Sequence, residues 1–142
     1  MKQDSLQSIE YQVALLVRLT TAHSPKLGIL DRSEYLILYE LQARGPLGIN
    51  VLAEHLMVSI STASRQVRNL ETKAYITRHP DPVNRRISLL QITDEGKEAL
   101  SKVQEARAAG YDEILEGWTK EELEQLEMNL SRLNHYFKKW KK

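Results

Sequence analysis

The sequence contains no cysteine, which excludes disulfide bonds, cysteine-ligated zinc and thiol redox sensing. No apolar run approaches the ~18 residues of a membrane-spanning helix. The N-terminal segment MKQDSLQSIEYQ is polar and carries acids, unlike a secretory signal. Glycine and proline are sparse, with six and four residues among 142, and they interrupt otherwise periodic segments. These features predict a soluble single-domain protein, with the cytoplasm as its default location and no membrane partner.

Motifs that carry catalysis are also lacking. The four histidines, at positions 23, 55, 79 and 135, form no i, i+4 pair, and the sequence holds no HExxH, CxxC, GxSxG, P-loop or GxGxxG pattern. The glutamates at 121, 122 and 124 fall on the exposed flank of a predicted helix and are interpreted as solvated side chains. The sequence therefore predicts no enzyme, no metal site and no cofactor.

The net charge of +1 gives no support to nucleic-acid binding, but the distribution of charge does. The segment 59–90 holds two acids, Glu71 and Asp81, against six cations: Arg65, Arg68, Lys73, Arg78, Arg85 and Arg86. Residues 1–44 carry five charges of each sign. The middle of the chain is thus a modest basic zone, and the alternative is a solvated surface on which arginines happen to cluster.

Apolar residues at three- and four-residue spacing predict six helices, over 5–22, 32–43, 51–56, 60–74, 93–116 and 119–140. Predicted helix caps are Asp31 or Ser33, Asn50, Ser59, Thr93, and Thr119, which forms a capping box with Glu122. In the second helix Leu36, Leu41 and Ala43 are among the apolar positions. In the fourth helix the apolar positions are Ile60, Ala63, Val67, Leu70 and Ala74.

Two strand-like runs, around 75–79 and 86–92, flank the turn formers Pro80-Asp81-Pro82-Val83-Asn84 and predict a β-hairpin. The segment Gly45-Pro46-Leu47-Gly48 predicts a turn. The predicted fold is mainly α with a small β-hairpin (α+β). Two short helices joined by Met57-Val58 and followed by a hairpin match the plan of a winged helix-turn-helix.

This plan predicts DNA binding by the helix over 60–74 and by the hairpin, or wing. A helix fits the major groove, where arginine pairs with guanine and glutamine pairs with adenine. Arg85 and Arg86 at the hairpin tip suit the negative potential of a minor groove. The alternative for the helix alone is a solvated polar face. The residues predicted to contact double-stranded DNA are Ser59, Ser61, Thr62, Arg65, Gln66 and Arg68 on the helix and Arg78, Asn84, Arg85 and Arg86 in the wing.

The sequence resembles the MarR family over nearly its whole length, most specifically within residues 47–96. The residues that carry the resemblance are LAEHLMVS at 52–59, Ser64-Arg65, Leu70-Glu71-Thr72-Lys73, the wing motif RHPDPVNRR at 78–86, and ITDEG at 92–96. The resemblance implies a homodimer joined by its N- and C-terminal helices, a pseudopalindromic operator, usually repression, and release by a small molecule. It implies a single MarR-type domain, 1–142, with a DNA-binding lobe at 32–96 and dimerisation helices at 1–31 and 97–142.

The sequence departs from the family pattern at two positions. Asn84 replaces an aspartate that orients nearby arginines in the family, which predicts a looser wing. Ala74 replaces a glycine at the end of the recognition helix. If that site requires a left-handed backbone, alanine costs about 1 kcal/mol; the alternative is an ordinary helical ending.

The apolar side chains of the last helix recur at strict steps of three and four residues, as in a coiled-coil seam. We expect this seam and the matching stripe of the first helix to form the dimer interface, through Leu6, Ile9, Val13, Leu16, Leu123, Leu126, Leu130, Leu133 and Phe137. The alternative is that the two helices pack only on each other within one chain. A pocket for a small aromatic effector is predicted from His23, Tyr35, Tyr39, Tyr111 and Trp118, with plain core and interface packing as the favoured alternative.

A final alternative concerns function. A protein-interaction module can keep the winged fold without binding DNA. Only a DNA-binding protein should lose duplex affinity steeply as salt rises, because bound phosphates release counterions.

Overall fold

The computed structural model describes residues 1–140, so residues 141 and 142 of the predicted dimerisation range lie outside the described residues. Its helices are α1 (Lys2–His23), the 3-10 helix η1 (Ser24–Leu27), α2 (Arg32–Arg44), α3 (Ile49–Leu56), α4 (Ile60–Thr72), α5 (Asp94–Ile114) and α6 (Lys120–Lys139). Its strands are β1 (Leu47–Gly48), β2 (Ile76–Pro80) and β3 (Ser88–Ile92). The mainly α fold with a small wing is confirmed.

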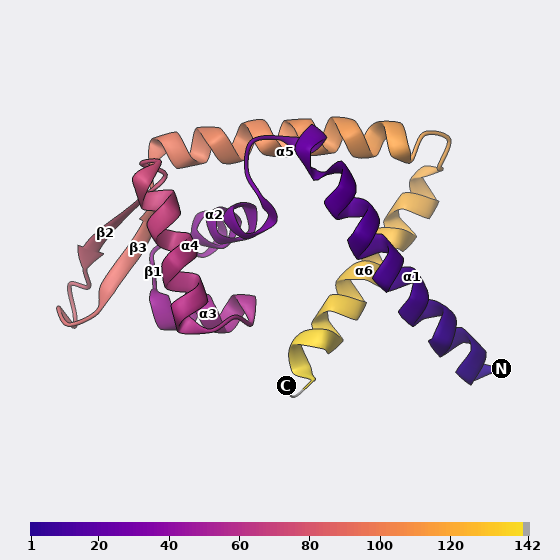
Figure 1. The fold of residues 1–142 in the computed structure, drawn as a ribbon, viewed down its shortest axis with the longest axis horizontal. Helices are drawn as coiled ribbons and strands as arrows, with labels where there is room; N and C mark the ends of the chain where they lie inside the picture. Colours follow the sequence, from indigo (N-terminus) through magenta and orange to yellow (C-terminus); the bar gives the residue numbers. More distant parts are fainter. Residues whose placement is uncertain (141–142) are drawn as a thin grey trace.

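The long helix α5 connects two parts of the molecule (Figure 1). At one end it packs on a lobe formed by α2, α3, α4 and the small sheet. Towards its other end α1 and α6 descend away from it (Figure 1).

The hydrophobic core belongs to the lobe and to the first half of α5. Its members all lie between residues 30 and 103, and they are Leu30, Ile37, Leu38, Leu41, Leu52, Val67, Leu70, Ile76, Leu90, Ile92, Leu100 and Val103. Burying each such side chain contributes about 1.5–3 kcal/mol before conformational entropy is subtracted. The core therefore fixes α4 and the wing relative to each other.

Several predicted positions are wrong in detail. In α2 the core face carries Ile37, Leu38 and Leu41, whereas Leu36 is 42% exposed and Ala43 is also exposed. In α3 the helix begins at Ile49 after Gly48, and Asn50 is not its cap. The phase of the apolar face of α2 depends on which neighbours cover the helix, and one sequence does not reveal them.

The sheet has three strands in the order β1-β3-β2, all antiparallel, instead of the predicted two. Leu47 of β1 lies opposite Leu90 of β3, and Gly48 lies opposite Leu89. The segment predicted as a turn therefore contains a two-residue edge strand, which is too short to show an alternating pattern.

The junction between α4, the wing and α5 is tightly built. Ala74 has φ of 65°, so the left-handed alternative is the correct one and the prediction of a helix through this residue is wrong. The Thr93 hydroxyl donates to the Ala74 carbonyl at 2.6 Å, and the Thr93 N–H donates to the Tyr75 carbonyl at 3.0 Å. At Gly96 an added Cβ would lie 2.4 Å from the Tyr75 carbonyl oxygen, so only glycine fits there.

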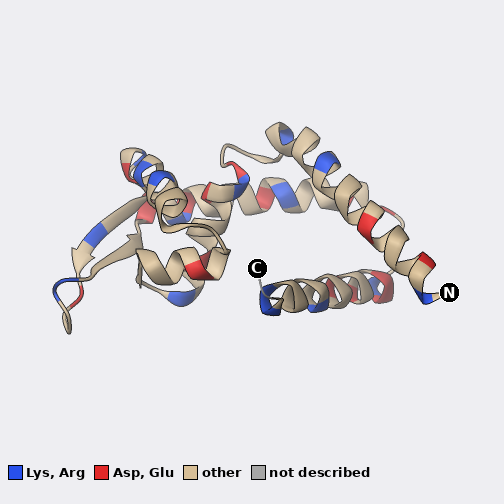
Figure 2. Cartoon of the chain, turned by 60° about the horizontal axis from the view of Figure 1, so that its bottom comes forward, with Lys and Arg blue, Asp and Glu red and all other residues tan. Residues whose placement is uncertain are grey.

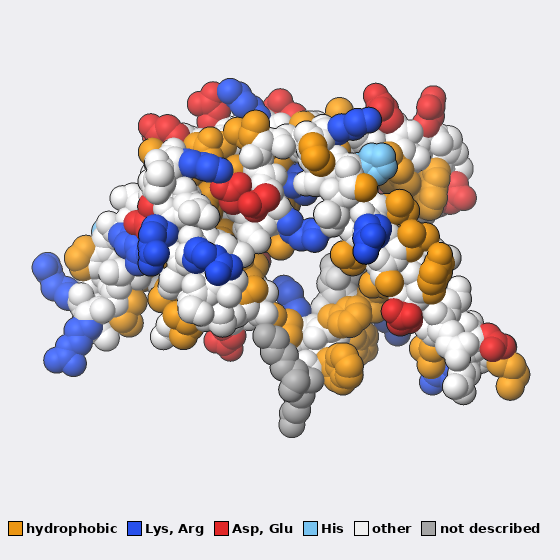
Figure 3. Space-filling model, in the orientation of Figure 1, with side chains coloured by type: hydrophobic (Ala, Val, Ile, Leu, Met, Phe, Trp, Pro, Cys, Tyr) orange, Lys and Arg blue, Asp and Glu red, His pale blue; other side chains and the backbone are white. Residues whose placement is uncertain are grey.

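The terminal helices lie outside this core. Neither α1 nor α6 contains a buried residue. Of the nine predicted interface side chains, Val13, Leu126 and Leu133 are half-buried; the others are exposed, at 55% for Leu6, 49% for Ile9 and Leu16, 39% for Leu123, 42% for Leu130 and 50% for Phe137. Figure 3 shows hydrophobic side chains gathered along this end of the molecule.

Candidate nucleic-acid interface

The helix α4 displays a polar face opposite the side chains with which it packs on the core. Ala63, Val67 and Leu70 are each 0% exposed. Ser59 caps the helix as predicted, since its side chain accepts a hydrogen bond from the Thr62 N–H at 3.1 Å. The opposite face carries Ser61, Arg65 and Arg68, all exposed.

Two of the predicted recognition residues are half-buried and already bonded within the protein. The Thr62 hydroxyl lies 2.9 Å from that of Ser59, which donates to it. The Gln66 amide donates to the Ser33 hydroxyl at the start of α2, at 3.0 Å. Gln66 thus ties α4 to α2, and contact with a base would require this hydrogen bond to be shared or exchanged.

The wing is an ordered hairpin. The strands β2 and β3 pair from Ile76 opposite Ile92 to Pro80 opposite Ser88. Beyond them the Asp81 N–H donates to the Ile87 carbonyl at 2.9 Å, and the Asp81 carboxylate accepts from the Val83 N–H at 2.8 Å. Asn84 accepts from the Arg86 N–H at 3.2 Å through its side-chain oxygen. Asn84 therefore organises the backbone of the tip, the role that an amide can fill without an ion pair.

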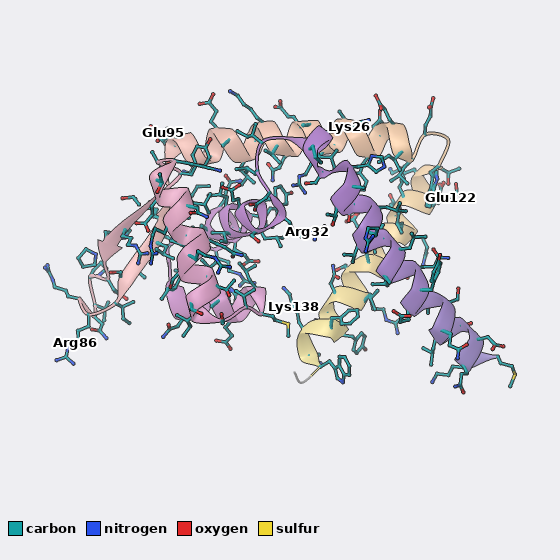
Figure 4. The ribbon with its side chains drawn as sticks, in the orientation of Figure 1. Lys26, Arg32, Arg86, Glu95, Glu122 and Lys138 are labelled. Atoms are coloured by element: carbon teal, nitrogen blue, oxygen red, sulfur yellow. The ribbon has the colours of Figure 1, made fainter. Side chains whose placement is uncertain are left out.

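Arg85 and Arg86 stand exposed at this tip. Figure 4 shows Arg86 pointing away from the body of the molecule, and basic residues colour the tip in Figure 2. Arg78, the third predicted wing arginine, lies differently. Its guanidinium donates two hydrogen bonds of 3.0 Å to the Glu71 carboxylate, so it joins β2 to the end of α4.

Lys73, which follows α4, is also paired within the protein. Its ammonium donates to the carboxylate of Glu34, which is 6% exposed and is part of the capping box that begins α2 with Asp31. The hydrogen bond to Glu34 raises the pKa of Lys73 above its ordinary value of 10.5. Lys73 therefore stays charged and holds the C-terminal end of α4 against α2.

Of the six cations in segment 59–90, four thus carry no hydrogen bond or ion pair through their side chains within the described residues 1–140, namely Arg65, Arg68, Arg85 and Arg86. The two acids of the segment are both engaged, Glu71 by Arg78 and Asp81 by a backbone N–H. The site is therefore a positive surface that the acids of the segment do not neutralise. It extends over α4 and the tip of the wing, and both α4 and the wing pack on the same core.

Comparison with known proteins identifies the family. YxaD of Bacillus subtilis, described as an uncharacterized HTH-type transcriptional regulator, is 36% identical over 138 residues, which cover 95% of this chain and 96% of YxaD. Residues 30–88 match the MarR family. The chain belongs to the MarR family.

Solved structures agree with this assignment. A MarR family protein from Bacillus stearothermophilus superimposes with a TM-score of 0.80 at 17% identity, over 96% of this chain and 98% of that one. The transcriptional regulator BldR from Sulfolobus solfataricus gives a TM-score of 0.72 at 28% identity, over 93% and 99% of the two chains. The protein is therefore a DNA-binding transcriptional regulator of the MarR family with a winged helix-turn-helix fold.

The five residues predicted to line an effector pocket do not meet in this MarR-family chain. Tyr35 and Tyr39 lie side by side on α2, with ring centroids 6.1 Å apart. His23 instead borders a separate hollow lined by η1 and α5. Tyr111 and Trp118 are 45% and 46% exposed, at the end of α5 and in the turn that follows it.

Sequence reasoning missed Arg107, a cation in contact with one of the predicted aromatic residues. Its guanidinium carbon lies 4.3 Å from the centre of the Tyr35 ring, a cation–π contact. Its Nε is buried without a hydrogen-bond partner. The signal that could have revealed Arg107 is weak, since it is one charged residue among several on α5.

Neither a membrane-spanning helix nor a metal-binding cluster occurs among the described residues 1–140. No helix within residues 1–140 is long and apolar enough to cross a membrane. Over the same residues no three histidine or acidic side chains gather where they could hold a metal ion.

Proposed function

We propose that this regulator is a cytoplasmic homodimer that binds a pseudopalindromic operator, acts as a repressor and is released by a small aromatic compound. One observation carries the DNA-contact part of this proposal. Arg65, Arg68, Arg85 and Arg86 are exposed cations without partners among the described residues, whereas Lys73 and Arg78 are paired. Unpaired arginines on two neighbouring elements are suited to binding a polyanion such as DNA.

Each part of the interface has its own role in the proposal. Arg65 and Arg68 project from the face of α4 that carries Ser61, where a recognition helix contacts the edges of bases. Arg85 and Arg86 extend beyond the paired strands, where a wing reaches the neighbouring minor groove. The core between the two elements fixes their spacing.

The proposed dimer follows from the terminal helices. The apolar seams of α1 and α6 remain largely exposed in one chain, and a stable soluble protein buries such a surface. Leu130 borders a hollow along α1 with Ile9, Val13 and Leu16, so the two seams already face a common space. A second copy with twofold symmetry would cover both seams and place two α4 helices about 34 Å apart along the duplex.

Arg107 and Tyr35 support the effector proposal. A buried Nε without a partner beside an aromatic ring suits an aromatic carboxylate, which offers both charge and a π-face. We expect compounds of this class to dissociate the protein from its operator. A screen of aromatic acids on the preformed complex tests this, and Arg107→Lys should weaken the response.

The test of DNA binding is a titration of duplex affinity against salt concentration, using fragments selected by the protein. Each phosphate contact should contribute about −0.9 to the slope of log affinity against log salt. Arg85→Ala should weaken binding and reduce the slope by about 1 for each subunit of the dimer, without changing the oligomeric state. Arg65→Ala should cost about 1–3 kcal/mol and relax the sequence preference.

The matched control is Lys102→Ala, which removes a cation on α5 that is 70% exposed. It should leave both affinity and slope unchanged. Absence of a salt-dependent duplex affinity in the wild-type protein would instead support a protein-interaction module with the same fold.

A further inference from the structure

Ile60, the first residue of α4, is exposed where its spacing predicts burial. It stands three residues before Ala63 and continues the stripe of Val67 and Leu70, yet 51% of it is exposed while these three are 0% exposed. Ile60 therefore shares the apolar spacing of α4 without sharing its burial. The first turn of α4 extends beyond the core and leaves a β-branched apolar side chain in water.

The hydrogen-bonding groups around Ile60 are engaged with one another. The Ser59 hydroxyl lies 3.2 Å from that of Ser61 and 2.9 Å from that of Thr62, and it also accepts the Thr62 N–H. The Ser59 hydroxyl thus links the hydroxyls of Ser61 and Thr62 to one another. In the first turn of α4 the exposed side chain of Ile60 therefore lies beside hydroxyls that are hydrogen-bonded to one another.

We propose that Ile60 contacts the C5-methyl group of a thymine in each half of the operator and so helps to determine its sequence. The inference rests on the proposed DNA-binding function. Residues at the N-terminal end of a recognition helix contact base edges, and the thymine methyl is the apolar group that the major groove presents. Arg65, further along the helix, serves a polar base edge, so the two side chains select different bases.

The expected effect is small and specific. Removing one buried methyl-sized group from a contact weakens binding about fourfold, and about fifteenfold when both half-sites lose it. Deoxyuridine differs from thymidine by this methyl group alone, so its substitution tests the contact without altering hydrogen bonds or charge.

The experiment uses the full-length protein and a duplex that the wild type selects from a random library. Each thymidine is replaced by deoxyuridine, one position at a time, and affinity is measured for the wild type and Ile60→Ala. The wild type should lose about fourfold at one thymidine in each half-site. Ile60→Ala should bind the thymidine and deoxyuridine duplexes equally, and Ile60→Val, which keeps the branched side chain, should retain most of the difference.

Ile29→Ala is the matched control, because Ile29 is an apolar residue that is 71% exposed and lies outside α4. It should keep the full deoxyuridine penalty. The inference is overturned if no deoxyuridine substitution weakens the wild type, or if Ile60→Ala shows the same penalty. A wild-type protein without salt-dependent duplex affinity would overturn the proposed function as well, so the two failures are distinct.

Discussion

Replacing Gly96 by alanine tests whether the junction between α4, the wing and α5 is as tight as its geometry indicates. Gly96 lies in the first turn of α5, behind its cap Thr93. A Cβ at this position would stand 2.4 Å from the Tyr75 carbonyl oxygen and 2.8 Å from the Ile92 side chain. The nearer obstacle is backbone, so it cannot rotate away.

The magnitude follows from three contributions. Alanine is favoured over glycine in a helix by about 1 kcal/mol. Forcing a methyl group into a packed site costs about 1–3 kcal/mol. Moving the Tyr75 carbonyl also strains its 3.0 Å hydrogen bond from the Thr93 N–H, which is worth about 1 kcal/mol. Gly96→Ala should therefore lower the free energy of unfolding by about 2 kcal/mol.

The assay is urea unfolding at fixed protein concentration, with Gly110→Ala as the control. Gly110 lies in the same helix, and its added Cβ would meet only the end of the Leu27 side chain at 2.8 Å. This flexible side chain can move, so Gly110→Ala should be neutral or stabilising by up to about 1 kcal/mol. Equal effects of the two substitutions would refute the reasoning, since both change the helix propensity alike.

Two further substitutions, at Ala74 and Lys73, test the C-terminal end of α4. Ala74→Gly should stabilise the protein by up to about 1 kcal/mol, because glycine tolerates the φ of 65°. The control Ala108→Gly, within α5, should destabilise the protein by about the same amount. Urea midpoints that shift in the same direction for both variants would contradict this. Lys73→Met should lower the free energy of unfolding at neutral pH by about 1 kcal/mol, since the ion pair is partly exposed. Glu34 raises the pKa of Lys73 above 10.5, so the contribution of the pair persists below that pH and is lost as pH rises through the raised value. The unfolding curves of wild type and variant should then converge, and a gap that grows with pH would be inconsistent with the pair.

Much of the fold was predictable because its local signals are strong and mutually consistent. The Ser59 cap, the Thr119 and Glu122 capping box and the hairpin around Pro82 are each encoded within a few residues. These signals concern backbone geometry, which depends mainly on neighbouring residues. The helices and the wing accordingly fall within a few residues of their predicted positions.

The errors concern contacts between segments far apart in the chain. Whether Leu36 or Ile37 faces the core depends on where α5 and the sheet cover α2, and periodicity alone does not set that phase. The strand β1 exists because Leu47 meets Leu90, a pairing of residues separated by a helix-turn-helix. Such facts follow from tertiary packing, which overrides local propensity.

The candidate site shows the same division. The sequence predicted the basic zone, but not which of its cations would be neutralised. Arg78 pairs with Glu71, seven residues earlier in the chain. Lys73 pairs with Glu34, thirty-nine residues earlier. Only the folded chain distinguishes these structural cations from the unpartnered arginines at Arg65 and Arg85.

The orientation of α4 depends on a short segment, 30–34, at the start of α2. Its Ser33 and Glu34 accept hydrogen bonds from α4, and the Leu30 carbonyl accepts one from Arg107 of α5 at 3.4 Å. Arg32, seen between α1 and the lobe in Figure 4, donates to the hydroxyls of Thr20 and Thr21 on α1.

The segment 30–34 therefore contacts α4, the long helix α5 and the terminal helix α1. We expect a displacement of α1 or α5 to act on the same segment that holds α4. Since packed interiors do not deform continuously, we expect a shift of this turn to move α4 with it. Substitutions at Ser33 or Arg32 should then alter operator affinity, although neither residue is proposed to contact DNA. Such an effect would show that the position of α4, and not only its base contacts, determines affinity.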